Sequence, residues 1–226
     1  MHALVASAGD PPDRAELDRA WPGWADGISL VIAADGGALT ALGLGFIPDL
    51  IVGDVDSLAA EALERIRAMG VAIRPSPMAK DESDTELAIR AAVERGARDI
   101  TIVGGQGGRP DHFLANIGLL ALPELAGRSV RLLDGMTRIS LLAGPARKEL
   151  EGRVGDLVSL LPFGRGVDGV STTGLAWVLE DEPLPAGPAR GLSNVRTERT
   201  ARVSVRQGLL GIVETTSAEE TDSLSS

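Results

Sequence analysis

Several aspartates of this chain directly follow predicted strands or begin predicted helices, which are common positions for catalytic and metal-binding residues. Asp35, Asp54 and Asp56 each come directly after an apolar run that predicts a strand, and Asp84 and Asp111 each open a predicted helix soon after another such run. Ligands of an open α/β sheet bind beyond the carboxyl ends of its strands. We therefore expect these side chains to gather at one edge of a sheet.

Several carboxylates at one sheet edge would repel one another unless a cation lay between them. Mg²⁺ is a hard cation that takes oxygen ligands and completes its shell with substrate phosphates. Alternate residues of an extended segment point the same way, so Asp54 and Asp56 could reach one ion together. The spacing favours a magnesium site.

Each carboxylate also has a purely structural alternative. Asp35 precedes two glycines and could be a turn residue. Asp56 or Ser57 could be the N-cap of the predicted helix 58–69, and Asp111 could cap the predicted helix 111–121. Ser83 and Glu86 form the Ser-x-x-Glu pattern of a capping box. Capping and metal binding can coexist in one segment, so both interpretations stay open at this stage.

A glycine-rich segment, 104–109, lies between a predicted strand and a predicted helix. Backbone N–H groups of such a loop can approach phosphate, and Arg109 would add a planar charged donor set. Pro110 stands where the last glycine of G-x-G-x-x-G would be. The alternative is a tight strand-to-helix turn without a ligand.

The composition excludes several classes of function. A net charge of −10 and only six aromatic residues, none of them tyrosine, argue against nucleic-acid binding. No apolar run has the length of a membrane span, and the start of the chain, Met1–Val5, has no basic n-region of a signal peptide, so we expect a cytoplasmic protein. The absence of cysteine excludes thiolate chemistry. Neither Lys80 nor Lys148 lies in a Walker P-loop, and His2 and His112 are too few for a histidine-rich zinc site.

The first part of the chain alternates apolar runs with helical periodicity. This alternation predicts a mostly parallel sheet with helices on both faces. The predicted strands are 3–7, 29–34, 50–53, 71–74, 99–104 and 130–133. The predicted helices are 13–20, 37–43, 58–69, 84–95 and 111–121.

From about residue 137 the pattern becomes short, β-rich and punctuated by Gly and Pro, which is typical of a small all-β sandwich. Its predicted strands are 137–143, 157–162, 170–173, 176–179 and 202–207. The predicted domains are an α/β domain over 1–136, a β-sandwich over 137–215 and a disordered polar tail over 216–226.

The segments, in this order, resemble the thiamine pyrophosphokinase family. In the first domain the matching pieces are Ala34-Asp35-Gly36-Gly37-Ala38, the stretch from Pro48 to Ser57, the stretch from Lys80 to Ala88, and the stretch from Gly107 to Asn116. In the second they are Ser159-Leu160-Leu161-Pro162-Phe163-Gly164, Thr172-Thr173-Gly174-Leu175-Ala176-Trp177 and Gly191-Leu192-Ser193-Asn194. The resemblance covers roughly residues 3–213.

The resemblance implies transfer of a diphosphate from ATP to the hydroxyl of thiamine. It implies a homodimer in which the β domain of one subunit completes the thiamine site of the other. The implied Mg²⁺ ligands are Asp35, Asp54, Asp56 and Asp84, of which the last three are expected to be catalytic. The implied ATP-binding residues are Lys80, Arg109 and Asp111, and the implied thiamine-binding residues are Ser83, Asp84, Trp177, Ser193 and Asn194.

Competing interpretations remain at this stage. One is a metal-dependent nucleotide phosphohydrolase that uses the same aspartates with water as the acceptor, and another is a non-enzymatic regulator that binds thiamine or a nucleotide. Trp177 could be a core residue of the β domain instead of a ring against which thiamine stacks. His112 is expected to be structural.

Overall fold

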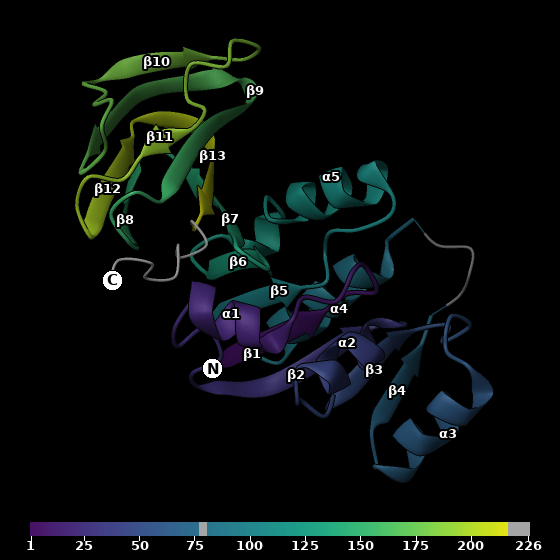
Figure 1. The fold of residues 1–226 in the computed structure, drawn as a ribbon. Coiled ribbons are helices and arrows are strands. Elements are labelled where there is room, and N and C mark those ends of the chain that lie inside the picture. The colour runs from purple at the N-terminus through teal and green to yellow at the C-terminus, as the bar shows by residue number, and fades with distance from the viewer. Residues whose placement is uncertain (77–80, 217–226) are drawn as a thin grey trace, which may run out of the picture. The chain divides into compact units, whose positions relative to one another are not determined.

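The structure is a computed structural model that describes residues 1–76 and 81–216. The chain divides into two compact units, Met1–Gly135 and Met136–Ser226. The first unit combines helices and strands, and the second is built of strands, as the ribbon in Figure 1 shows. The predicted fold class, an α/β domain followed by an all-β sandwich, is confirmed. The helices of the described residues are all too short or too polar to cross a bilayer.

The α/β unit is a parallel sheet in the order β4-β3-β2-β1-β5-β6. Its strands are β1 (His2–Ala6), β2 (Ile28–Ala34), β3 (Leu50–Gly53), β4 (Ala72–Pro75), β5 (Asp99–Val103) and β6 (Ser129–Asp134). Its helices are α1 (Arg14–Ala20), α2 (Gly37–Gly43), α3 (Ala60–Ala68), α4 (Asp84–Glu94), α5 (Pro110–Leu119) and the short 3-10 helix η1 (Pro123–Leu125).

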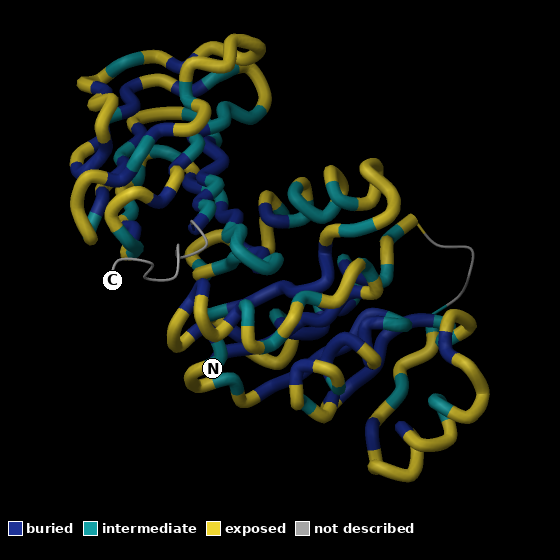
Figure 2. The backbone as a smooth tube through the Cα atoms, in the orientation of Figure 1, coloured by how far each residue is buried: buried dark blue, intermediate teal, exposed yellow. Residues whose placement is uncertain are grey.

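The strand order reverses direction at β1, which creates a crevice for ligands. The chain runs outward from β1 to β4 and then returns to place β5 on the other side of β1. Because crossovers between parallel strands are right-handed, α1 to α3 cover one face and α4 and α5 the other. All five residues of β1 are buried, and the central strands are dark blue in Figure 2. Ligands of such sheets bind where the order reverses, at the carboxyl ends.

The β unit is an antiparallel assembly in the order β7-β13-β9-β12-β8, with β10 and β11 also pairing with β9. Its strands are β7 (Thr137–Ala143), β8 (Ala146–Glu151), β9 (Leu157–Thr173), β10 (Glu182–Pro185), β11 (Asn194–Val195), β12 (Thr200–Val205) and β13 (Gln207–Thr215). One apolar core includes side chains of most of these strands, among them Leu150, Val158, Val203 and Ile212.

The 17-residue strand β9 belongs to two sheets of this unit, one formed with β7 and β13 and the other with β8 and β12. Its first part pairs with β13 and its last part with β12. The predicted strands 157–162 and 170–173 are its two ends. The chain bends between them at Gly164 and Gly169, which have positive φ angles of 72° and 66°. Glycine takes such angles without steric cost, so the strand bends where the sequence analysis expected it to end.

Other predictions for the β unit were wrong in detail. The segment 176–179 is not a strand, and β8, β10, β11 and β13 were not predicted. The sequence of β8, Ala-Arg-Lys-Glu-Leu-Glu, carries too few apolar residues for a strand to be recognised from periodicity. Thr216, assigned to the tail, is buried, and its N–H donates to the Met136 carbonyl. The rest of the predicted tail, 217–226, lies outside the described residues.

Candidate active site

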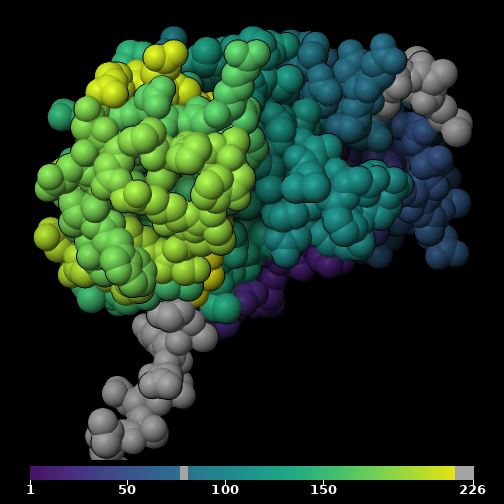
Figure 3. Space-filling model, turned by 90° about the horizontal axis from the view of Figure 1, so that it is seen from above, coloured from purple at the N-terminus to yellow at the C-terminus, as the bar shows by residue number. Residues whose placement is uncertain are grey.

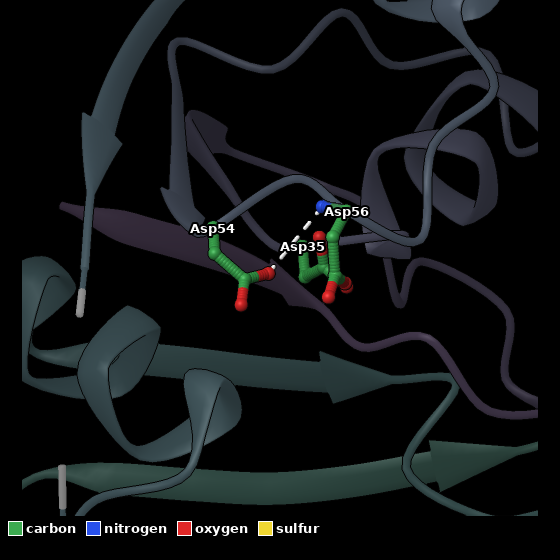
Figure 4. Close-up of side chains that lie close together, drawn as sticks. All are labelled: Asp35, Asp54 and Asp56. Atoms are coloured by element: carbon green, nitrogen blue, oxygen red, sulfur yellow. Dashed lines mark hydrogen bonds between the residues drawn. The ribbon is translucent and has the colours of Figure 1, made fainter. Parts of the chain in front are cut away.

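Three of the predicted metal ligands form one cluster at the carboxyl ends of β2 and β3. Asp35, Asp54 and Asp56 each offer a carboxylate oxygen, and these oxygens all lie within 4.8 Å of one another. Figure 4 shows the three side chains together, with Oδ1 of Asp54 accepting a hydrogen bond of 3.3 Å from the backbone N–H of Asp56. The sequence analysis predicted that these three carboxylates lie at the carboxyl edge of the sheet, and the structure brings them together there.

Unusual backbone geometry brings the carboxylates together. Asp35 has a φ of 48° and Val55 a φ of 57°, both in the left-handed region that a β-branched residue rarely enters. A Cβ atom at Gly53 would lie 3.0 Å from the Cβ of Asp35, so only glycine allows β3 to pass this close. The segment between Asp54 and Asp56 is therefore a strained turn, and the extended geometry expected from the sequence was wrong. Such strain is typical of functional sites.

The charges of the cluster act on one another. Repulsion by Asp54 is the main cause that raises the pKa of Asp56 above its ordinary value, and the hydrogen bond between their side chains, partial desolvation and the charges of Asp35 and Asp84 add to it. Oδ1 of Asp35 is buried and has no hydrogen-bond partner among the described residues. A buried oxygen without a partner is costly. A cation between these carboxylates would remove both the repulsion and this cost.

The structure shows which of the candidate residues are helix N-caps. Helix α3 begins at Ala60 with Ala59 as N-cap, so Asp56 does not cap it. Helix α5 begins at Pro110 and has no side-chain cap, so Asp111 is not its N-cap. Ser83 does cap α4, since its Oγ accepts a bond of 3.2 Å from the N–H of Glu86. The capping explanation therefore fails for Asp56, which belongs to the carboxylate cluster.

A cleft of about 620 Å³ opens beside Asp35 at the amino end of α4. Ser83, Asp84 and Arg109 line it together with Asp35, so the structure brings four predicted site residues to one space. Asp84 lies in the first turn of α4, and its Oδ1 accepts a bond of 3.4 Å from the hydroxyl of Ser76. His112, expected to be structural, also lines the cleft, with an exposed side chain. Lys80 lies outside the described residues.

Arg109 and Asp111, both predicted to bind ATP, bind each other. Two hydrogen bonds of 2.6 and 3.2 Å join the guanidinium to the carboxylate, and both side chains are exposed. The hydrogen bond from Arg109 is the main cause that lowers the pKa of Asp111. An exposed ion pair of this kind is weak, so phosphate could replace Asp111 as the partner of Arg109.

The cleft also contains residues that the sequence analysis did not select. The loop Ser7-Ala8-Gly9 at the end of β1 lines it, and so does Asn116, whose side-chain N–H donates to the Gly105 carbonyl at 2.7 Å. Gly107 must be glycine, since its φ is 119° and a Cβ there would meet the Asp10 side chain at 2.4 Å. The glycine-rich loop thus packs against the loop after β1. A small polar segment directly after the first strand was the signal that could have shown this.

A second hollow, of about 640 Å³, lies in the β unit. Its lining includes Trp177, Leu192, Arg190 and Asn194. The side chain of Trp177 is 61% exposed, so it is not a core residue. Trp177, Val178 and Leu192 are the exposed large apolar residues of this hollow, and their segment is light green in Figure 3. The hollow therefore presents an indole to solvent.

Ser193 and Asn194, both predicted to bind thiamine, differ in their surroundings. Ser193 is exposed with a φ of 56°, and its N–H donates to the hydroxyl of Ser159 at 3.0 Å. Asn194 is buried, and its amide binds both the N–H and the carbonyl of Trp177, at 3.0 and 2.7 Å.

Comparisons with known proteins assign both units. Residues 24–131 match the model of the thiamin pyrophosphokinase catalytic domain, and residues 147–210 match the model of its vitamin B1 binding domain. The chain is 30% identical over 195 residues to the thiamine pyrophosphokinase of Bacillus subtilis, covering 86% of this chain and 91% of that protein. The chain belongs to the thiamine pyrophosphokinase family. The carboxylate cluster lies within the first match, and Trp177 and Asn194 lie within the second.

Solved structures agree with this assignment. The crystal structure of the Bacillus subtilis thiamine pyrophosphokinase superposes with a TM-score of 0.83 at 26% identity, covering 96% of this chain and 100% of that one. The thiamin pyrophosphokinase of Geobacillus thermodenitrificans gives a TM-score of 0.80 at 25% identity, covering 97% of this chain and 99% of that one. Thiamine pyrophosphokinase 1 of Oryza sativa is 27% identical over 172 residues, covering 72% of this chain and 64% of that protein. Members of this family are ATP-dependent diphosphotransferases.

Proposed function

We propose that the chain transfers the diphosphate of ATP to the hydroxyl of thiamine and releases AMP. In this reaction the thiamine oxygen loses its proton and bonds to the β-phosphorus, and the bond between that phosphorus and the oxygen shared with the α-phosphate breaks. The observation that carries the proposal is the carboxylate cluster, with its cleft, inside a match to the catalytic domain of this family.

The aspartates fit Mg²⁺ as the cofactor. The buried oxygen of Asp35, which has no partner among the described residues, and the mutual repulsion of Asp54 and Asp56 suit a donor set for a cation. Asp35, Asp54 and Asp56 would hold the ion, and Asp84, at the edge of the same cleft, would join them. When bound, the ion supplies positive charge to the phosphate oxygens as the bond to the leaving AMP breaks.

The chain's own groups would orient the substrates. Arg109 would exchange its partner Asp111 for a phosphate, and the amino end of α4 would favour negative charge near Ser83. Asp84 would orient the thiamine hydroxyl or accept its proton, since its carboxylate lies in the first turn of α4 at the cleft. Phosphoryl transfer depends mainly on such positioning and charge neutralisation.

The hollow of the β unit would bind thiamine. An exposed indole can stack against the thiazolium or aminopyrimidine ring, and the cationic ring adds attraction to the indole face. The match of this unit to the vitamin B1 binding domain supports that role. A hydrolase that uses water as acceptor would need no such hollow.

One incubation tests the proposal. The protein is mixed with ATP, Mg²⁺ and thiamine, and AMP and thiamine diphosphate are measured together. We expect both products in equal amounts, and neither when thiamine or Mg²⁺ is left out. AMP or ADP released at the same rate without thiamine would indicate a phosphohydrolase. Binding of thiamine without any product would indicate a regulator.

We also infer that the protein is a homodimer with shared active sites, as the family resemblance implies. The largely apolar helix α5 buries none of its residues in the single chain, and Leu114 on it is 67% exposed. A second subunit would cover such a surface. Sedimentation should then give about twice the chain mass of 23.4 kDa, and a fully active monomer would contradict the shared site. The cytoplasmic location stays a prediction.

A further inference from the structure

The amide of Asn194 holds the backbone of Trp177 from both sides. Its Oδ1 accepts from the Trp177 N–H at 3.0 Å, and its Nδ2 donates to the Trp177 carbonyl at 2.7 Å. The same Oδ1 also accepts from the N–H of Val195 at 2.9 Å. One donor and one acceptor directed at a single residue are what a neighbouring strand would provide, yet Trp177 lies outside the strands of the described residues.

The loop around Trp177 is anchored at its other residues as well. The N–H of Ala176 donates to the carbonyl of Val195 at 2.8 Å. Leu179 exchanges two hydrogen bonds with Thr172, one between backbones and one from its N–H to the Thr172 hydroxyl, both 2.9 Å. The backbone of the loop is therefore fixed while the indole that it carries is exposed.

We propose that Asn194 is a positioning residue that presents Trp177 as a rigid stacking surface. It acts on thiamine through Trp177 and not by direct contact. The inference rests on the proposed function for the identity of the ligand, and on the hydrogen bonds above for the mechanism. The family resemblance assigned Asn194 to thiamine binding, whereas its burial and its bonds assign it to the support of the tryptophan.

We call the two hydrogen bonds between the Asn194 amide and the Trp177 backbone the clamp, and we expect it to act through conformational entropy. A loop that carries a large exposed side chain loses conformational freedom when a ligand stacks on it, and this loss weakens binding. The clamp fixes the loop before the ligand arrives. Asn194 is only 7% exposed, and both of its polar atoms already have backbone partners, so it is badly placed to bind a ligand itself.

A double-mutant cycle separates the two roles. In Asn194→Asp the acceptor remains, but a carboxylate oxygen replaces the donor next to the Trp177 carbonyl. We expect the KM for thiamine to rise about tenfold, the size of one lost hydrogen bond, while the KM for ATP and kcat change little. In a Trp177→Ala background the same substitution should add no further rise, because coupled residues are not additive. A full tenfold effect in both backgrounds would show direct contact and overturn the proposal.

Fluorescence gives a readout that does not depend on turnover. Trp21 and Trp24 are buried, so a collisional quencher such as acrylamide mainly reports Trp177. We expect Asn194→Asp to lower the fluorescence anisotropy of the quenchable component at an unchanged secondary-structure content. Unchanged anisotropy in a folded variant would overturn the clamp even if the protein turns over thiamine. A wild-type protein without turnover would contradict only the proposed function.

Ser140→Ala controls for simple loss of stability. It removes a partly buried hydrogen bond, from Lys148 to the hydroxyl of the buried Ser140 at 2.7 Å, on strand β7 of the same unit. If Asn194→Asp unfolds, Asn194→Ser takes its place with the same cycle. A rise in the thiamine KM of equal size in Ser140→Ala would show a general stability effect and overturn the positioning role.

Discussion

The two units surround their carboxylates in opposite ways. In the α/β unit three carboxylates lie within 4.8 Å of one another, and one of their buried oxygens has no partner among the described residues. In the β unit the buried Glu214 accepts hydrogen bonds from both Arg138 and Arg196, and the Asn194 amide binds backbone groups.

The difference indicates what kind of ligand each site can bind. Repelling carboxylates store an electrostatic cost that a cation and its phosphates would remove. In the hollow of the β unit the Asn194 amide already binds backbone groups, so the exposed indole of Trp177 is a surface that a ligand can contact. The first site is thus prepared for charge, and the second for a flat ring.

The largest expected effect concerns the carboxylate cluster. Asp54→Asn or Asp56→Asn should lower turnover by about a hundredfold or more, since each removes a charged ligand from the site where phosphate charge is balanced. Without metal, Asp56→Asn should melt at a higher temperature than the wild type, because it removes repulsion. AMP release and thermal melting measure the two effects.

The size of this gain in stability depends on pH. Because the folded protein raises the pKa of Asp56, its ionised form destabilises the fold above that pKa, and the penalty disappears as the carboxyl is protonated at lower pH. The gain from Asp56→Asn should therefore shrink as the pH falls through the raised pKa of Asp56, and it should be gone below the ordinary carboxyl range. Glu149→Gln, which removes an exposed partner of Arg202, is the control. Near-normal turnover of both aspartate variants at low Mg²⁺ would contradict the metal assignment.

Removing a charge from the buried ion pair of the β unit should lower the melting temperature, whereas removing one from the carboxylate cluster should raise it. Arg196 and Glu214 are 1% and 2% exposed, and their bond is 2.9 Å. Arg196→Met leaves Glu214 with one cationic partner fewer, and breaking a buried pair costs about 3–5 kcal/mol. We expect a large drop in melting temperature. Arg202→Met, which breaks the exposed pair with Glu149, should change it little; equal shifts would contradict the comparison.

Trp177→Ala tests the hollow. We expect the thiamine KM to rise roughly tenfold to a hundredfold with the ATP KM unchanged, since stacking and attraction between the cationic ring and the indole are each worth ~0.5–1.5 kcal/mol. Because the side chain is 61% exposed, the melting temperature should stay near that of the wild type. Trp24→Ala, at a buried tryptophan, should instead cost about 3–5 kcal/mol. Unchanged thiamine affinity in a folded Trp177→Ala would reject the stacking role.

The two units also differ in how far the sequence predicts them. The carboxylates of the α/β unit follow short apolar strands, and parallel strands align their carboxyl ends, so local patterns suffice to place Asp35, Asp54 and Asp56 together. The strained turn at Val55 could not be predicted, because a β-branched residue rarely takes a positive φ. In the β unit the decisive bonds join Asn194 to Trp177, which are 17 residues apart, and no local pattern reports them.

The smallest expected effect on turnover concerns Ser7 and Thr85, two hydroxyl residues that line the cleft. The hydroxyls of Ser7 and Thr85 lie 2.8 Å apart and are buried, and Thr40 donates to the Ser7 carbonyl at 3.0 Å. These bonds tie the first turn of α4, which carries Asp84, to the end of β1. These bonds could not be predicted from local sequence patterns, since the partners come from separate elements.

Thr85→Val keeps the shape of the side chain but removes its hydroxyl, so Ser7 loses a buried partner. Such a loss costs about 1–3 kcal/mol. If the pair only stabilises the fold, the melting temperature falls and turnover at a permissive temperature stays normal. If it also positions Asp84, kcat falls several-fold while the KM for thiamine changes less, because the hollow of the β unit is untouched. Thr85→Ser restores the hydroxyl and should recover both quantities. Failure of the serine variant to recover kcat would show that the methyl group of Thr85, and not the hydroxyl pair, supports this end of α4.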